Sequence, residues 1–146
     1  MGMQRLLLTL LLVVSACILS PSISRAAGGD DAAIAEAGNT FFKKYLSSKD
    51  QWAYLLKSPL VTPAAKSAFQ AIKKKADKDG GLDSDPVVKG QDHADSYSIG
   101  KIHVEGPTAT AVAQAKGWSN IPMRFVHGKD GWQIDGVGEI NISSKH

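Results

Sequence analysis

The sequence contains a single cysteine, Cys17, which lies in an apolar stretch near the N-terminus. If export removes that stretch, the remaining chain has no thiol, so it can form no disulfide bond. A cysteine nucleophile is excluded for the same reason. The stability of the folded part must then come from burial of apolar side chains and from hydrogen bonds.

The sequence also has little net charge. The formal charge is +3, but Arg5 and Arg25 lie near the N-terminus, so residues 27–146 carry 15 basic and 14 acidic residues, a net charge of +1. Binding of nucleic acid usually requires a clustered basic surface. The basic cluster at residues 73–78 falls near the end of an expected helix, where the helix dipole favours cations. We therefore expect no nucleic-acid partner.

Motifs of common enzyme classes are missing. There is no Gly-x-Ser-x-Gly nucleophile elbow, and neither of the glycine-rich loops that bind phosphates occurs. The 4 histidines are too scattered for the short spacings of zinc motifs. We expect no metal and no cofactor, and the sequence assigns no catalytic residue.

Residues 1–26 have the composition of an export signal. Arg5 supplies a positive charge, an apolar run of 14 residues extends from Leu6 to Leu19, and small residues follow at Ser24 and Ala26. A membrane-spanning helix needs roughly 18 or more apolar residues. The pattern predicts a secretory signal peptide and export to the periplasm.

Cys17 has two alternative fates. Residues 14–17, Val-Ser-Ala-Cys, resemble a bacterial lipobox, in which the cysteine is lipidated and anchors the mature protein to the membrane. Ordinary cleavage after Ala26 would discard Cys17 and release a soluble protein. The small residues Ser24 and Ala26 favour ordinary cleavage after Ala26. The position of Cys17 directly after an apolar run favours lipidation instead. Both alternatives stay open.

Residues 27–146 predict a single α+β domain. Apolar residues first recur at helical spacing and later alternate as in strands. Short, turn-rich connections predict that consecutive strands pair antiparallel, with the helices on one face of the sheet. The expected parts are a flexible leader at 27–31, a helical part at 31–81 whose first helix starts at Ala32, a connecting loop at 82–96, and a sheet at 97–142 with strands at 97–104, 108–115, 121–127 and 131–142.

The first expected strand changes its alternation part-way. Tyr97 and Ile99 share one parity, whereas Ile102 and Val104 share the other. Because a slip of one residue moves side chains to the opposite face, we expect a β-bulge at Gly100-Lys101.

Small residues gather on one face of the expected sheet. Alternate residues from Ala109 to Ala115 are alanine, and Gly136 and Gly138 share the parity of Trp132 and Ile134. The space left by these residues serves either close packing of helices or a ligand cavity.

Taken in order, these segments resemble the bacterial exported proteins of the domain of unknown function 3828 family. The matching segments are Phe41–Leu46, Leu60–Phe69, Asp85–Val87, Gly90–Asp92 and Gly131–Val137. The resemblance covers nearly all of residues 32–140. It implies a nuclear-transport-factor-2-like or cystatin-like cone, with N-terminal helices packed on a curved four-stranded antiparallel meander. It implies export, sometimes as a lipoprotein, and no known reaction.

Two places are candidate binding sites. Asp85, Gln91 and Asp92 lie just before the sheet, where two carboxylates and an amide could bind a polar ligand. The alternative is that they serve the local turns, because Asp side chains commonly cap backbone groups there. Trp118 lies in an expected turn, where it could anchor a protein partner or fold back over the sheet edge.

The leading hypothesis is a non-catalytic envelope protein that binds a small ligand or a protein partner. One alternative is an immunity-type inhibitor of a secreted toxin, and another is an isomerase-like enzyme, by analogy of fold. We expect an Arg124–Asp135 pair across neighbouring strands. With Glu139, this pair places charge on the outer sheet face, so we expect a monomer.

Overall fold

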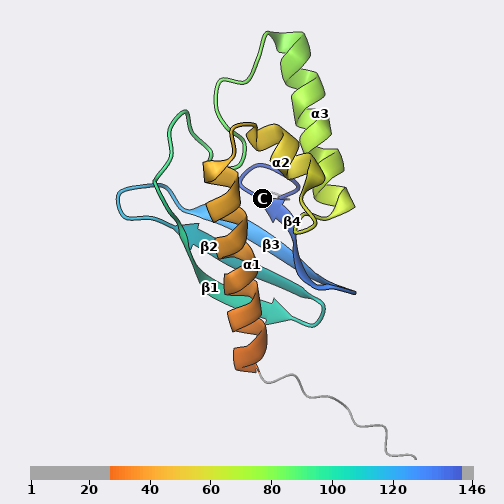
Figure 1. Ribbon diagram of the computed structural model, residues 1–146, viewed down its shortest axis with the longest axis vertical. Helices are drawn as coiled ribbons and strands as arrows, with labels where there is room; N and C mark the ends of the chain where they lie inside the picture. Colours follow the sequence, from red (N-terminus) through yellow and green to blue (C-terminus); the bar gives the residue numbers. More distant parts are fainter. Residues whose placement is uncertain (1–26, 143–146) are drawn as a thin grey trace, which may run out of the picture.

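The computed structural model describes residues 27–142, which form three helices and a four-stranded sheet (Figure 1). The elements are α1 (Ala27–Ser47), α2 (Gln51–Lys57), α3 (Pro63–Asp79), β1 (Ser98–Glu105), β2 (Thr108–Gln114), β3 (Ile121–Gly128) and β4 (Gly131–Val137). The predicted signal peptide and Cys17 lie outside the described residues.

The sheet is an antiparallel meander in the order β1-β2-β3-β4. In Figure 1, α1 runs across the sheet, whereas α2 and α3 lie near β4. Val61, just before α3, forms a parallel bridge with Ile134 of β4, which joins the helical part to that edge. The predicted α+β class, with helices packed on an antiparallel meander, is confirmed.

Local signals set the ends of α2 and α3. The Asp50 side chain accepts a hydrogen bond of 2.9 Å from the backbone N–H three residues later, and Thr62 accepts one of 3.2 Å from the N–H of Ala65. Both are N-caps. Pro63 occupies the first turn of α3, and Gly80 ends it with a φ of 95°.

The expected flexible leader at residues 27–31 is wrong. These residues form the beginning of α1, so the helix starts at Ala27 rather than at Ala32. Asp30 accepts a hydrogen bond of 3.1 Å from the Trp132 indole N–H, which attaches the first turn to β4. The negative charge of Asp30 is also favourable near a helix N-terminus.

The small residues of the sheet serve close packing. Ala109, Ala111 and Ala113 are buried in the same apolar cluster as Phe41 and Phe42 of α1. On α1 itself, Gly38 lies so near β1 that an added Cβ would be 2.6 Å from Cγ1 of Ile99. These contacts favour tight helix packing over a ligand cavity above the alanine row.

The predicted bulge in β1 is confirmed. The register with β2 shifts between Gly100 and His103, and Lys101 has a φ of 50°, in the left-handed region. Ile99 before the bulge and Ile102 after it both pack against the core. The bulge therefore keeps apolar side chains on one face despite the change of parity.

The last strand is shorter than expected. A second bulge leaves Asp135 without a partner in the register, because Phe125 pairs with Ile134 and Arg124 with Gly136. Because of this bulge, Gly136 lies on the opposite face of the sheet from Ile134. The expectation that these two residues share a face is therefore wrong.

After the second bulge, the chain leaves the sheet at Val137 rather than continuing to Ile142, and the sheet spans 98–137 instead of 97–142. Gly138 then turns with a φ of 62°. Its N–H donates to Pro122 O at 3.0 Å, and the Glu139 N–H donates to Pro86 O at 2.8 Å. Both bonds bind the turn to neighbouring segments and end the strand.

Candidate functional site

The connecting loop, residues 82–96, lies between α3 and β1 and contains the three residues predicted to bind a ligand. Figure 1 shows it running from the end of α3 past α1 to the start of β1. Several hollows border this loop, and His93 lines two of them.

Asp85 organises the loop. One carboxylate oxygen accepts a hydrogen bond of 2.7 Å from the Tyr45 hydroxyl, and the other accepts one of 2.7 Å from the Val87 N–H. The backbone closes around it, since the Asp85 N–H donates to Gly90 O at 2.9 Å. Burial, followed by the hydrogen bond to Asp85 and its negative charge, raises the pKa of Tyr45 above the ordinary 10.0. This carboxylate therefore serves local structure, as the turn alternative proposed.

Gln91 and Asp92 are exposed and also make local bonds. Gln91 Nε2 donates to Asp83 O at 3.1 Å, and Asp92 Oδ1 accepts from the His93 N–H at 2.9 Å. Asp85 and Gln91 do lie together in one hollow of about 430 Å³, but Asp92 is not among its lining residues. That lining is Gln51, Trp52, Leu82, Asp83, Ser84, Asp85, Val88, Gly90, Gln91 and His93.

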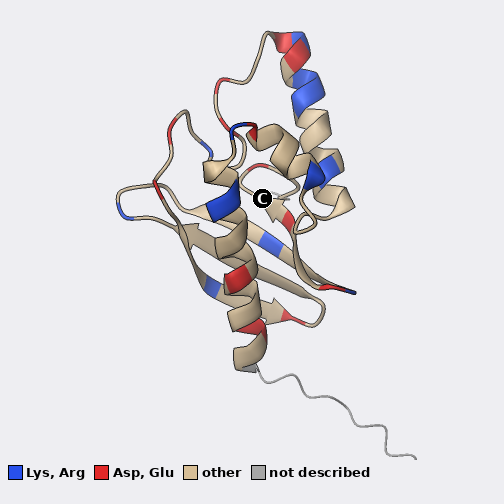
Figure 2. Ribbon diagram, viewed as in Figure 1, with Lys and Arg blue, Asp and Glu red and all other residues tan. Residues whose placement is uncertain are grey.

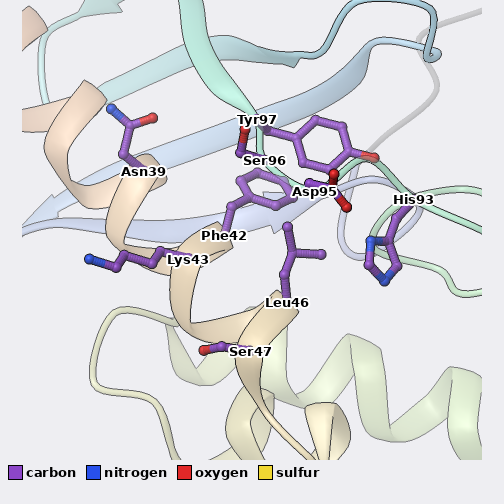
Figure 3. A pocket seen from close by; sticks show the side chains of 9 residues that line it. All are labelled: Asn39, Phe42, Lys43, Leu46, Ser47, His93, Asp95, Ser96 and Tyr97. Carbon is purple, nitrogen blue, oxygen red and sulfur yellow. The ribbon is translucent and has the colours of Figure 1, made fainter.

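The second hollow, which we call the α1 groove, lies between α1 and the end of the connecting loop (Figure 3). Its volume is about 410 Å³. In Figure 3, Phe42 and Leu46 of α1 point toward Tyr97, whereas Lys43 extends away from that side. The lining is Asn39, Phe42, Lys43, Leu46, Ser47, His93, Asp95, Ser96 and Tyr97.

The α1 groove combines an apolar floor with polar groups at its rim. Phe42 and Tyr97 are buried, and their rings lie 4.9 Å apart between centroids. Asp95 and Lys43 are exposed, and among residues 27–142 neither side chain has a hydrogen bond or an ion pair. An apolar surface with a few free polar groups is typical of small-molecule sites.

Sequence reasoning missed this groove. Its two walls are separated by about 50 positions along the chain, and only tertiary packing brings them together. One signal was present: Asn39, Lys43 and Ser47 recur every four residues and form a polar stripe beside the apolar face of α1.

Trp118 is 40% exposed in the connection between β2 and β3. Its backbone N–H donates to Ala115 O at 3.1 Å, which fixes the turn and not the indole. Among the described residues only Leu82, at 36%, is another exposed large apolar side chain. An accessible indole of this kind suits contact with a protein partner.

The predicted cross-strand ion pair is present. Arg124 Nη2 lies 2.8 Å from Asp135 Oδ2, and Nε donates to the same oxygen at 3.0 Å. The other oxygen accepts a bond of 2.7 Å from the Thr62 hydroxyl. Asp135 therefore links β3 and β4 to the N-terminus of α3, and these contacts assign it a structural role.

The lysines near the end of α3 do not form a surface of one sign. Lys73 pairs with Asp77 at 2.9 Å, and Lys75 pairs with Asp79 at 2.6 Å. Figure 2 shows acidic and basic residues together at the end of this helix. These exposed i,i+4 pairs contribute little to stability.

Within residues 27–142 no group of three or more His, Cys, Asp or Glu side chains is arranged to hold a metal ion. In the same part of the chain, no helix has the length and apolar character that crossing a membrane requires. No protein-family model, curated protein or solved structure matches the chain. The resemblance to the domain of unknown function 3828 family therefore stays a prediction.

Proposed function

We propose that the chain is an exported protein of the bacterial envelope whose α+β domain binds a small ligand without catalysing a reaction. The α1 groove is the observation that carries this proposal. It has an apolar floor at Phe42 and Leu46 and unpaired polar groups at its rim, Asp95 and Lys43. Its volume of about 410 Å³ lies at the lower end of the range of roughly 300–1,000 Å³ for ligand pockets.

The candidate carboxylates of the connecting loop fit binding or structure better than acid–base chemistry. An isomerase-like reaction needs a carboxylate held in an apolar pocket. Asp92 is exposed, and Asp85 accepts hydrogen bonds from Tyr45 and Val87. Neither residue meets that requirement.

Export is the second part of the proposal. Residues 1–26 direct the chain to the periplasm, and the protein is either soluble after cleavage behind Ala26 or anchored through a lipid on Cys17. We also propose a monomer, because the Arg124–Asp135 pair places charged side chains on the outer face of the sheet.

Trp118 favours a second candidate, the immunity-type inhibitor of a secreted toxin. In that case the exposed indole would enter the toxin, because tryptophan is enriched among the residues that dominate protein interfaces. A Trp118→Ala variant would fold normally but fail to protect cells against the toxin. Equal protection by this variant would remove the hypothesis.

The groove is tested by recording amide NMR shifts while the small-molecule fraction of an envelope extract is added to the exported protein. The proposal predicts shift changes concentrated in residues 39–47 and 93–97. Ser96→Trp places an indole in the groove and should abolish them, whereas Ser67→Trp, on the exposed surface of α3, should preserve them. Shift changes that persist in Ser96→Trp, or none in the wild type, would contradict the proposal.

A further inference from the structure

The loop side of the α1 groove presents hydrogen-bond acceptors. Asp95 carries a negative charge and makes no bond within residues 27–142. The Tyr97 hydroxyl accepts from the Ala94 N–H at 3.2 Å, and it keeps a second lone pair. This side therefore suits a group with several N–H donors and a positive charge, such as an ammonium.

The helix side of the groove presents the opposite charge. Lys43 lines the groove and has no partner among the described residues. Its side chain extends away from Tyr97 in Figure 3, but exposed side chains change rotamer within nanoseconds, so the ammonium can reach a ligand at the rim. Ser47 lines the same side. A ligand with only a positive charge would be repelled by Lys43, and one with only a negative charge by Asp95.

The floor between these charges is apolar. Phe42 and Leu46 point toward Tyr97, and the aromatic rings of Phe42 and Tyr97 lie 4.9 Å apart. An apolar side chain placed on this floor would leave water and gain favourable contacts. The groove volume of about 410 Å³ is suited to a small ligand rather than to a large cofactor.

From this arrangement we propose that the α1 groove binds an apolar amino acid or a short apolar peptide in its zwitterionic form. The ammonium binds Asp95, the carboxylate binds Lys43, and the apolar side chain lies on Phe42 and Leu46. This inference names the ligand class of the proposed binding function and rests on it. A free amino acid and a peptide share the same chemistry and differ in the distance between their charged ends.

The test uses the exported protein and amide NMR titrations with phenylalanine, the dipeptide leucyl-phenylalanine, N-acetylphenylalanine and phenylalanine amide. Phenylalanine or the dipeptide should shift the amides of residues 39–47 and 93–97. If phenylalanine binds more tightly, the ligand is a free amino acid, and if the dipeptide does, it is a peptide. Either result supports the proposed ligand class. The forms lacking one charge should bind at least about tenfold more weakly, since each loses a charge-assisted hydrogen bond.

Variants assign the two charges. Asp95→Asn and Lys43→Gln should each weaken binding of the zwitterion about tenfold. Asp130→Asn, in the turn before β4, and Lys44→Gln, the exposed neighbour on α1, should leave it unchanged. The zwitterion inference would be overturned if N-acetylphenylalanine and phenylalanine amide bound as tightly as phenylalanine. It would also be overturned if Asp95→Asn left the affinity unchanged.

The outcome separates this inference from the proposed function. If envelope extract shifts the groove amides but no zwitterion does, the ligand class is wrong and the binding function stands. If neither shifts them, both fail.

Discussion

The Tyr45 hydroxyl donates a hydrogen bond of 2.7 Å to the Asp85 carboxylate, across 40 positions of the sequence. This contact joins α1 to the connecting loop. It therefore helps to set the spacing between the two walls of the α1 groove.

This bond can be tested by removing the Tyr45 hydroxyl, with removal of the Tyr54 hydroxyl as the control. Tyr45→Phe should lower the free energy of unfolding by about 1–2 kcal/mol, because it leaves a partly buried carboxylate oxygen without its donor. The hydroxyl of Tyr54 is buried and has no hydrogen bond of 3.5 Å or less among the described residues; the Ser58 side chain lies near it but makes at most a longer, weaker contact. Tyr54→Phe should therefore be neutral or stabilising. Urea denaturation measures both, and an equal loss in the two variants would contradict this assignment.

Stability should fall in alkaline solution. Burial, with the hydrogen bond to Asp85 and its charge, raises the pKa of Tyr45 above the ordinary 10.0. The unfolded chain therefore releases this proton at a lower pH than the folded chain. The contribution of protonated Tyr45 to the free energy of unfolding is fully present below about pH 10. It is lost as the pH rises above that value, by at most about 1.4 kcal/mol per pH unit. Denaturation between pH 9 and pH 11 should show a shallower decline in Tyr45→Phe, and identical slopes would exclude the effect.

Gly38 tests the close approach of α1 to the sheet. An added Cβ would lie 2.6 and 2.8 Å from two carbons of Ile99, so Gly38→Ala should destabilise by about 1–3 kcal/mol despite its better helix propensity. Gly29 lies in the same helix with nothing within 4 Å of such a Cβ. Gly29→Ala should stabilise by up to about 1 kcal/mol. If thermal melting shows that both variants are stabilised, the described packing is wrong.

The Arg124–Asp135 pair is tested by a double-mutant cycle with Arg124→Met and Asp135→Ala. Asp135→Ala should cost more than Arg124→Met, because it also removes the acceptor of the Thr62 hydroxyl. The coupling free energy between the two positions should be about 0.5–2 kcal/mol, since the pair is partly buried and doubly hydrogen-bonded. A coupling near zero would show that the pair contributes nothing.

Local signals in the sequence account for much of the fold. The N-caps Asp50 and Thr62 and the C-cap Gly80 set the helix ends, and these residues act on neighbouring backbone groups. The β1 bulge was also readable, because the change of parity around Gly100-Lys101 left no other way to keep one apolar face.

Features that depend on distant contacts were not predictable. The start of α1 depends on the Trp132–Asp30 bond, and the end of β4 depends on the bond from Glu139 to Pro86. The α1 groove exists only because the end of the connecting loop packs beside α1. The sequence predicted one binding site of Asp85, Gln91 and Asp92; Asp85 and Gln91 line a common hollow but Asp92 does not, and the groove with unpaired charges lies elsewhere.

The most direct test of ligand binding is native mass spectrometry of the protein purified from the envelope of cells that produce it. The wild type and Ser67→Trp should carry the mass of a small ligand, and Ser96→Trp should lack it. The protein mass in the same spectrum shows where the mature chain begins and whether Cys17 carries a lipid. A wild type without bound ligand, or an equal ligand mass on Ser96→Trp, would contradict the proposal that the α1 groove is a binding site.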